Sequence, residues 1–134
     1  YAEVDIRMLP GHTTGDGLAY LRKHLDDPAI DIAIIGEKNP SRSAPEGRLF
    51  TALADATRAE YPDATVTPVM TPGGSTDSSY FRELGAKAYG LCPIIAPREQ
   101  LDGFHGHNEF ITVEQLAAGT RVLVRAIAAA ATAP

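Results

Sequence analysis

The chain has 134 residues, enough for one ordinary domain core but not for two. Its net charge of −5, without any basic cluster, argues against nucleic-acid binding, and no apolar run approaches the roughly 18 residues of a membrane span. The single cysteine, Cys92, excludes an internal disulfide and is expected to be a small buried hydrophobe. Composition therefore predicts a soluble protein, either cytoplasmic or periplasmic and secreted, with no nucleic-acid or membrane partner.

The first 38 residues have the pattern of a strand, a helix and a second strand. Apolar and charged side chains alternate over residues 1–8, which is typical of a half-exposed strand. A turn-rich link leads to Asp16, which is expected to cap a short helix that Pro28 stops. Residues 29–36 have the composition of a second strand. Because the chain begins directly on a strand, with Tyr rather than Met, we expect it to be a piece of a longer polypeptide.

The sequence pattern after residue 38 predicts a helix, a strand, a helix, a strand and a final helix. Strands are expected over residues 64–70 and 86–94, with a short helix between them that Gly85 ends. This alternation of strands and helices indicates the α/β class. The polar, proline-containing stretch between the two parts is the expected boundary, which divides the chain into residues 1–38 and 39–134.

Two capping-box patterns mark where helices should begin. Ser43 stands three residues before Glu46, and Thr112 stands three residues before Gln115. Residues 96–111 are expected to be mostly loop, and the alanine-rich end of the final helix is expected to fray. The apolar face of that helix is predicted to consist of Val113, Leu116, Thr120, Leu123, Val124 and Ile127.

A glycine-rich turn, TPGGST, precedes the short helix at residues 71–76. Exposed backbone N–H groups and the positive end of a helix suit an anion, such as a carboxylate, a phosphate or a developing oxyanion. The turn lacks the Gly-Lys-Ser/Thr of a phosphate loop and the third glycine of a dinucleotide-binding fingerprint. The alternative is a tight turn in which Asp77 complements the helix dipole.

Two further features have a functional and a structural interpretation. Arg7 lies on the polar face of the first predicted strand, where its guanidinium could bind a carboxylate with two hydrogen bonds or remain solvated. In FHGHNEFI, His105 and His107 point the same way if the loop is extended, and imidazole is a common zinc ligand. This pair alone does not complete a metal site, so a solvated loop is the alternative.

Taken in order, VDIRMLPG, GGSTDSSYFRELG and HGHNEFI resemble the C-terminal part of the dinuclear-zinc amidohydrolase and peptidase family. That family includes aminoacylase, glutamate carboxypeptidase, acetylornithine deacetylase and succinyl-diaminopimelate desuccinylase. The resemblance covers nearly the whole chain; each motif alone is weak, and the three in order are more specific. It implies that residues 1–38 end a small βαβ lid or dimerisation domain. Residues 39–134 would then form the C-terminal αβαβα part of the catalytic domain.

The resemblance assigns substrate contacts to two of these stretches. Arg7 matches an arginine of the lid domain that binds the substrate carboxylate. The turn that lines the substrate pocket is matched by Gly73, Gly74, Ser75 and Thr76. Asp77 matches the turn's aspartate, with a mainly structural role. Many family members carry an arginine where this chain has Ser79, and this departure leaves the substrate specificity open.

The resemblance also divides the two histidines. His105 precedes Asn108 and Glu109 by the family spacing and matches a zinc ligand, whereas His107 falls on a variable position. Glu109 matches a structural carboxylate outside the metal's own ligand set. The remaining zinc ligands and the general base of the family lie upstream of the matched portion. No catalytic residue is therefore expected in this chain, and the chain alone is expected to be inactive.

The implied function is zinc-dependent hydrolysis of amide bonds in peptides or N-acyl amino acids that carry a free carboxylate, with two zinc ions per complete site. The implied partners are this substrate, the N-terminal remainder of the same enzyme and a second subunit in a homodimer. Two alternatives stay open: a metal-free relative that acts as a binding or receptor-like domain, and a stand-alone α/β module that binds anions through the glycine-rich turn.

Overall fold

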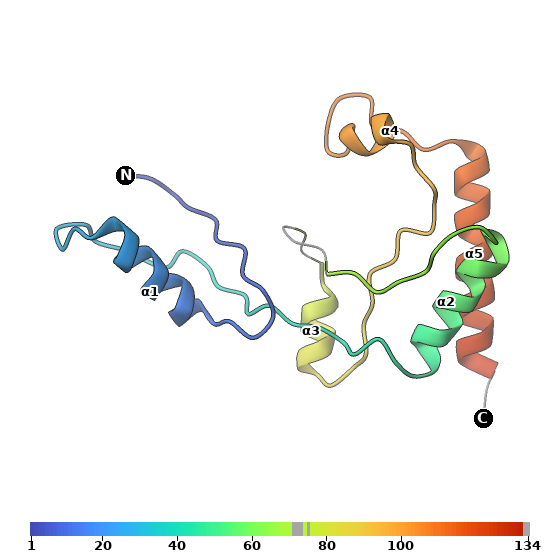
Figure 1. The fold of residues 1–134 in the computed structure, drawn as a ribbon, viewed down its shortest axis with the longest axis horizontal. Coiled ribbons are helices and arrows are strands. Elements are labelled where there is room, and N and C mark those ends of the chain that lie inside the picture. Colours follow the sequence, from blue (N-terminus) through green and yellow to red (C-terminus); the bar gives the residue numbers. More distant parts are fainter. Residues whose placement is uncertain (71–73, 75, 133–134) are drawn as a thin grey trace. The chain divides into compact units, whose positions relative to one another are not determined.

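The computed structural model describes residues 1–70, 74 and 76–132 (Figure 1). It contains five helices there, which are α1 (Thr14–Leu25), α2 (Arg48–Glu60), α3 (Ser78–Glu83), α4 (Arg98–Asp102) and α5 (Val113–Thr132). The chain divides into two compact units. The first consists of Tyr1–Ala44 with Met70–Ala88, and the second of Pro45–Val69 with Tyr89–Pro134.

The described residues contain no strand, so the predicted α/β architecture is not seen and this part of the chain is helical. The four predicted strands, over residues 1–8, 29–36, 64–70 and 86–94, are drawn in Figure 1 without arrows. A strand requires a ladder of hydrogen bonds to a neighbouring strand, and an alternating sequence specifies two faces but no partner. Their apolar side chains remain largely exposed, as Ile35 at 81% illustrates.

Helix α1 begins earlier than the sequence pattern suggested. Thr13 is its N-cap, and Asp16 closes a capping box from the third helical position instead of capping the helix itself. The Asp16 carboxylate accepts the Thr13 N–H at 2.7 Å, and this backbone hydrogen bond lowers the pKa of Asp16. The helix ends at Leu25, before Pro28, as predicted.

Helix α2 does not begin at the predicted capping box of Ser43 and Glu46, and this prediction was wrong. Its N-cap is Gly47, which has a φ of 84° and gives the helix no side-chain cap. The Ser43 hydroxyl instead accepts the Ala88 N–H at 3.0 Å and the Arg82 Nε–H at 3.3 Å. A tertiary contact within the first unit has therefore taken the group that would have capped the helix.

Helix α5 begins at the predicted capping box. The Thr112 N–H donates to Oε1 of Gln115 at 2.9 Å, and the Gln115 N–H donates to Oγ1 of Thr112 at 3.1 Å. The alanine-rich end is helical to Thr132, and the last two residues of the stretch expected to fray, Ala133 and Pro134, lie outside the described residues. Although α5 is the longest of the described helices, none of them is long and apolar enough to cross a membrane.

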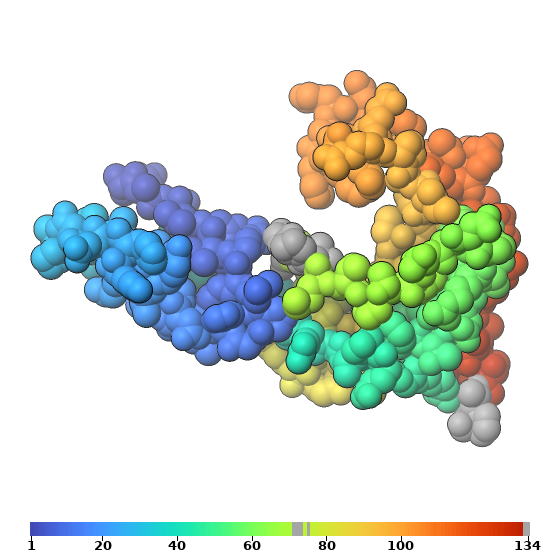
Figure 2. All heavy atoms as spheres, in the orientation of Figure 1, coloured from blue at the N-terminus to red at the C-terminus, as the bar shows by residue number. Residues whose placement is uncertain are grey.

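Helices α2 and α5 lie against each other and form the core of the second unit (Figures 1 and 2). Ala56 of α2 meets Val122 and Ala126 of α5, both of which are at most 1% exposed. The predicted apolar face of α5 is on the surface instead, with Leu116 57% and Ile127 66% exposed. Small side chains allow two helix backbones to approach closely. Helix α5 therefore packs on α2 through the face that carries Val122 and Ala126, and not through its face of larger apolar side chains.

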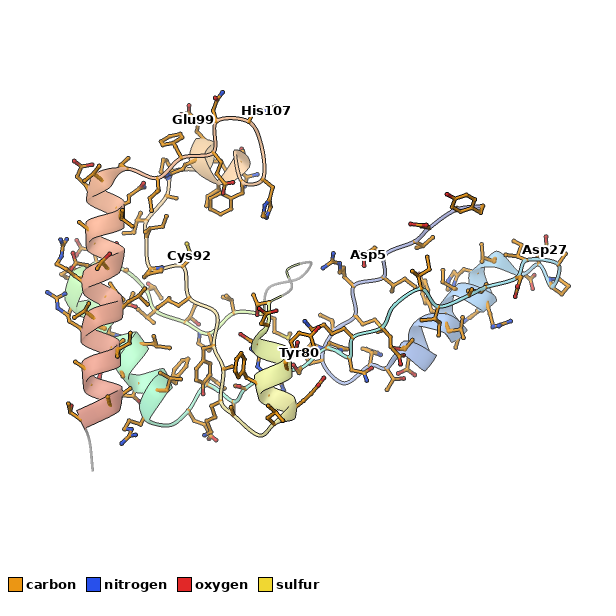
Figure 3. The ribbon with its side chains drawn as sticks, turned by 180° about the vertical axis from the view of Figure 1, so that it is seen from behind. Asp5, Asp27, Tyr80, Cys92, Glu99 and His107 are labelled. Atoms are coloured by element: carbon orange, nitrogen blue, oxygen red, sulfur yellow. The ribbon has the colours of Figure 1, made fainter. Side chains whose placement is uncertain are left out.

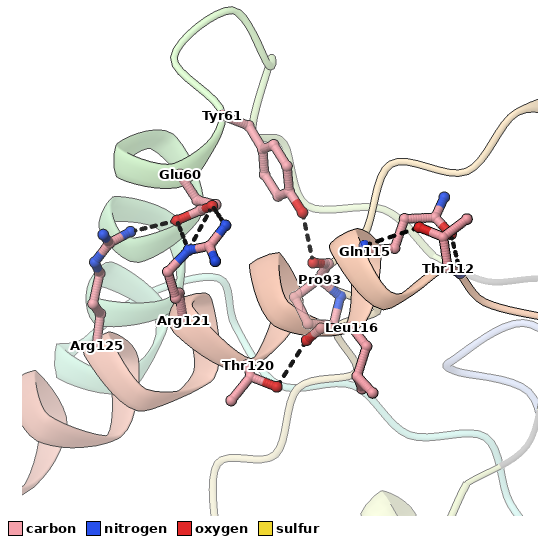
Figure 4. A network of polar contacts seen from close by, with 9 residues as sticks. All are labelled: Glu60, Tyr61, Pro93, Thr112, Gln115, Leu116, Thr120, Arg121 and Arg125. Atoms are coloured by element: carbon pink, nitrogen blue, oxygen red, sulfur yellow. Dashed lines mark hydrogen bonds and ion pairs between the residues drawn. The ribbon is translucent and has the colours of Figure 1, made fainter.

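A partly buried carboxylate reinforces this helix pair (Figure 4). The Glu60 side chain at the end of α2 is 11% exposed and accepts hydrogen bonds from two arginines of α5. Arg121 donates through Nη2 at 2.5 Å, and Arg125 donates through Nη1 at 2.7 Å. The hydrogen bonds from Arg121 are the main cause of a lowered Glu60 pKa.

This cluster predicts an acid-sensitive helix pair. Because the Glu60 pKa is lower in the folded state than its ordinary value of 4.5, its contribution to stability is fully present above that value. The contribution is lost as the pH falls below 4.5 and through the lowered pKa of the folded state. Glu60→Gln should therefore reduce the free energy of unfolding at pH 7 and flatten its decline toward acid.

Unfolding by urea, measured across this pH range for both proteins, checks the expectation. Asp55→Asn is the matched control, because Asp55 lies on the same helix and, among the described residues, pairs only with the exposed Arg58 of its own helix. Surface changes of this kind alter stability by no more than about 0.5 kcal/mol. A Glu60→Gln protein with the wild-type pH dependence would contradict the role of the cluster.

Candidate functional site

Arg7, the predicted carboxylate anchor, lies in the first unit before α1. Its side chain is 51% exposed, and its guanidinium pairs with the Asp5 carboxylate, with Nε at 2.9 Å and Nη2 at 2.6 Å from Oδ2. Figure 3 places Asp5 on the same N-terminal segment. An exposed ion pair of this kind contributes about 0–1 kcal/mol to the stability of the fold.

The predicted anion-binding turn is only partly described. Gly73 and Ser75 lie outside the described residues, whereas Gly74 and Thr76 are both exposed. The Thr76 carbonyl accepts a hydrogen bond from Nζ of Lys38 at 3.1 Å. The same ammonium lies 4.3 Å from the ring centre of Tyr80, an arrangement typical of a cation–π contact. Figure 3 labels Tyr80 on α3. The edge of the turn is thus fixed within the first unit.

Asp77 occupies the N-cap position of α3, but its side chain makes no capping hydrogen bond. The Ser78 N–H donates to Oγ1 of Thr76 at 3.3 Å instead. The predicted end of the helix agrees with the structure, because Gly85 follows α3 with a φ of 84°, a left-handed conformation that glycine adopts most easily. The structural role assigned to Asp77 stays a prediction.

His105 lies in the second unit, on the loop between α4 and α5. Its φ of 61° is left-handed, as is that of Asn108, and the Gly106 N–H donates to the Gly103 carbonyl at 2.9 Å. The His105 N–H donates to Oε2 of Glu109 at 3.2 Å. These contacts wind residues 103–109 into a tight loop, so the condition under which His105 and His107 would point the same way, an extended loop, is not met.

The two histidines differ in their backbone geometry. His107, labelled in Figure 3, is exposed on this loop and lies between the two left-handed residues His105 and Asn108. The His105 side chain is also exposed, and among the described residues no hydrogen bond occupies either of its ring nitrogens. Both nitrogens are therefore open to an external partner.

The described residues fit one metal ligand but not a whole metal site. An exposed imidazole on a tightly wound loop is a suitable ligand for zinc. Within residues 1–70, 74 and 76–132, however, no three His, Cys, Asp or Glu side chains lie close enough to hold a metal ion together. Cys92, predicted to be buried, is exposed and belongs to no such cluster (Figure 3).

One set of contacts around the His105 loop has no counterpart among the features predicted from the sequence. Helix α4 was expected to be loop, and its Gln100 is a polar side chain that is only 3% exposed. The Gln100 side-chain amide pairs with that of Gln115, which the sequence had identified only as part of a capping box. A buried glutamine has no sequence signal of its own, because glutamine is usually found on the surface.

The sequence is similar to that of a known protein family and of several named proteins. Residues 6–129 match the model of the family described as "Peptidase family M20/M25/M40". The chain is 25% identical over 116 residues to a probable carboxypeptidase S-like 2 of Dictyostelium discoideum, covering 84% of this chain and 22% of that protein. It is 27% identical over 116 residues to the human N-fatty-acyl-amino acid synthase/hydrolase PM20D1, covering 84% of this chain and 23% of that protein.

A third relative, the PM20D1 of Xenopus tropicalis, is 25% identical over 118 residues, which cover 86% of this chain and 23% of that protein. The chain thus spans less than a quarter of the length of these relatives. No solved structure matches the chain. Because the family model covers nearly all of the sequence, the chain belongs to peptidase family M20/M25/M40.

Proposed function

We propose that this chain is the C-terminal part of a metal-dependent hydrolase that cleaves amide bonds in peptides or N-acyl amino acids with a free carboxylate. The observation that carries the proposal is the family match over residues 6–129. The names of the relatives, a carboxypeptidase S-like protein and an N-fatty-acyl-amino acid synthase/hydrolase, support this substrate class. The bond that a carboxypeptidase cleaves and the bond of an N-acyl amino acid are both amides.

In this proposal His105 is one ligand of a site that holds two zinc ions. Its exposed imidazole and the left-handed loop that presents it support the assignment. Glu109 accepts the His105 N–H and so holds the backbone of the ligand rather than the metal. When bound, the metal pair would supply Lewis-acid chemistry, which lowers the pKa of water and polarises an amide carbonyl. The other ligands and the general base belong to the N-terminal remainder of the enzyme.

Arg7 and the glycine-rich turn provide the proposed substrate contacts. Arg7 would exchange its pairing with Asp5 for the free carboxylate of the substrate and so fix the orientation of the scissile amide. The turn formed by Gly73, Gly74, Ser75 and Thr76 would border the pocket, with Asp77 supporting it. At the edge of this turn, Lys38 donates a hydrogen bond to the Thr76 carbonyl.

The domain assignment follows the same proposal. Residues 1–38 would end a lid or dimerisation domain, and residues 39–134 would complete the catalytic domain. The apolar side chains exposed in the chain support this arrangement, because Val4, Ile35 and Leu116 would have the remainder of the enzyme to pack against. The chain alone is expected to be inactive, and the homodimer is part of the proposal.

Native mass spectrometry of the full-length protein, combined with metal analysis and a hydrolysis assay, tests the proposal. Two zinc ions per subunit and release of free amino acid from N-acyl amino acids or dipeptides are expected. The assay should include long-chain N-acyl amino acids, because the human and Xenopus relatives are named for them. A metal-free protein that binds these compounds without cleaving them would contradict the proposal and support the binding-domain alternative.

A further inference from the structure

Two glutamine side chains form a closed pair of hydrogen bonds beneath the His105 loop. Nε2 of Gln100 donates to Oε1 of Gln115 at 2.9 Å, and Nε2 of Gln115 donates back to Oε1 of Gln100 at 2.8 Å. The second hydrogen of each amide reaches a backbone carbonyl. Gln100 donates to Phe110 at 2.7 Å, and Gln115 donates to Ile95 at 2.8 Å.

All four side-chain N–H groups of this pair are used, and Oε1 of Gln115 accepts a further hydrogen bond from the Thr112 N–H. Gln100 is 3% exposed, so its hydrogen bonds are shielded from competing water. A buried polar network is stable only when its members are satisfied, and the loss of one partner leaves the others unpaired. The hydrogen bonds therefore hold the Gln100 and Gln115 side chains in one arrangement.

The pair joins the two ends of the segment that carries His105. Ile95 lies before α4, and Phe110 lies after the loop, so the amides close the base of residues 96–109. Figure 4 shows Gln115 and Thr112 at the beginning of α5. Within the closed segment, the hydrogen bond from His105 to Glu109 and the left-handed backbone complete the loop. The base of the loop is thus attached to the first turn of the long helix.

We propose that Gln100 and Gln115 are positioning residues for His105, which hold the loop so that the imidazole meets the metal in the correct place. This inference rests on the proposed role of His105 as a metal ligand. Neither glutamine touches the metal or the substrate in this proposal. They act through the backbone of the loop, as supporting groups do around other metal sites.

Two variants break the pair, and a third serves as the control. Gln100→Met keeps the approximate side-chain volume but removes every hydrogen bond that the Gln100 side chain makes. Gln115→Glu keeps an acceptor for the Thr112 N–H but places an oxygen against the Ile95 carbonyl. Thr112→Ala leaves the amide pair intact and removes the Oγ1 acceptor of the helix cap. Together the three separate loop positioning from the stability of α5.

Each variant is made in the full-length protein and is characterised by two measurements besides activity. Hydrogen exchange reports the opening of residues 103–111, and competition with a chelator reports the affinity for zinc. Gln100→Met and Gln115→Glu should each accelerate exchange in the loop and weaken zinc binding by about 10- to 100-fold. KM should change by less than kcat, and Thr112→Ala should behave like the wild type in both the loop and the zinc affinity.

His105→Ala separates the two proposals. If it loses zinc while both pair-breaking variants keep wild-type affinity, the positioning role is wrong and the metal assignment stands. If His105→Ala keeps zinc, His105 is not a metal ligand. The proposal that Gln100 and Gln115 position a metal ligand is then wrong as well. If both pair-breaking variants fail to fold while Thr112→Ala folds, the pair supports the whole unit and the local role is overturned.

Discussion

Replacing His105 with alanine in the full-length protein is expected to remove one zinc ion per subunit and nearly all hydrolysis. The methyl group of alanine cannot bind a metal in place of an imidazole. The other imidazole of this exposed loop, that of His107, is attached two residues further along the chain. Because a catalytic metal contributes several kcal/mol to transition-state stabilisation, the loss in kcat should be about a thousandfold. Metal analysis and steady-state kinetics measure the two effects separately.

His107→Ala is the matched control, because it removes the same chemical group from the same exposed loop. Its metal content should stay at the wild-type level, and its kcat should change less than about twofold. Equal losses in the two variants would indicate that the loop, and not the His105 imidazole, had been damaged. Wild-type metal content and turnover in His105→Ala would rule out the ligand assignment.

Replacing Arg7 with alanine is expected to weaken hydrolysis of substrates with a free carboxylate by about 10- to 100-fold in kcat/KM. Hydrogen bonds between charged groups contribute about 1.5–3 kcal/mol, and a guanidinium provides two of them to one carboxylate. A methyl ester of the same substrate lacks this charge and should be cleaved with little difference between the two enzymes. Equal losses on acid and ester would exclude the anchoring role.

Two further variants test the geometry of the Arg7 anchor. Arg7→Lys keeps the charge but loses the planar fork, so it should recover only part of the activity on free acids. Asp5→Asn removes the charge that now pairs with Arg7. If Asp5 and the substrate compete for the same guanidinium, KM for free acids should fall or stay constant. A large rise in KM would mean that Asp5 holds Arg7 in its working position.

Helix positions followed from local sequence because the interactions that begin and end helices span only three or four residues. Thr112 and Gln115 formed the predicted capping box, and Gly85 took the predicted left-handed conformation after α3. The same reasoning failed at Ser43, whose hydroxyl is used by Ala88 and Arg82. A capping pattern predicts a helix start only when no distant group claims the same side chain.

The site was less accessible to sequence reasoning than the helices. Three short motifs in order indicated the family, which the family match then confirmed. Their spacing could not show that the His105 loop is tightly wound, because its conformation depends on hydrogen bonds to Glu109 and on the closure of its base. The burial of Gln100 and its hydrogen bonds at the base of the loop could not be predicted, since nothing in the sequence distinguishes a buried glutamine from a solvated one.

The sequence by itself determined the family, the approximate helices and the residues worth testing, because motifs and helix caps are encoded locally. Only the tertiary structure decided which face of α5 is buried. Val122 and Ala126 meet Ala56, while the larger apolar face remains exposed. It also showed that the predicted strands are unpaired among the described residues. Both outcomes depend on the partner that a surface meets, and neither periodicity nor propensity specifies that partner.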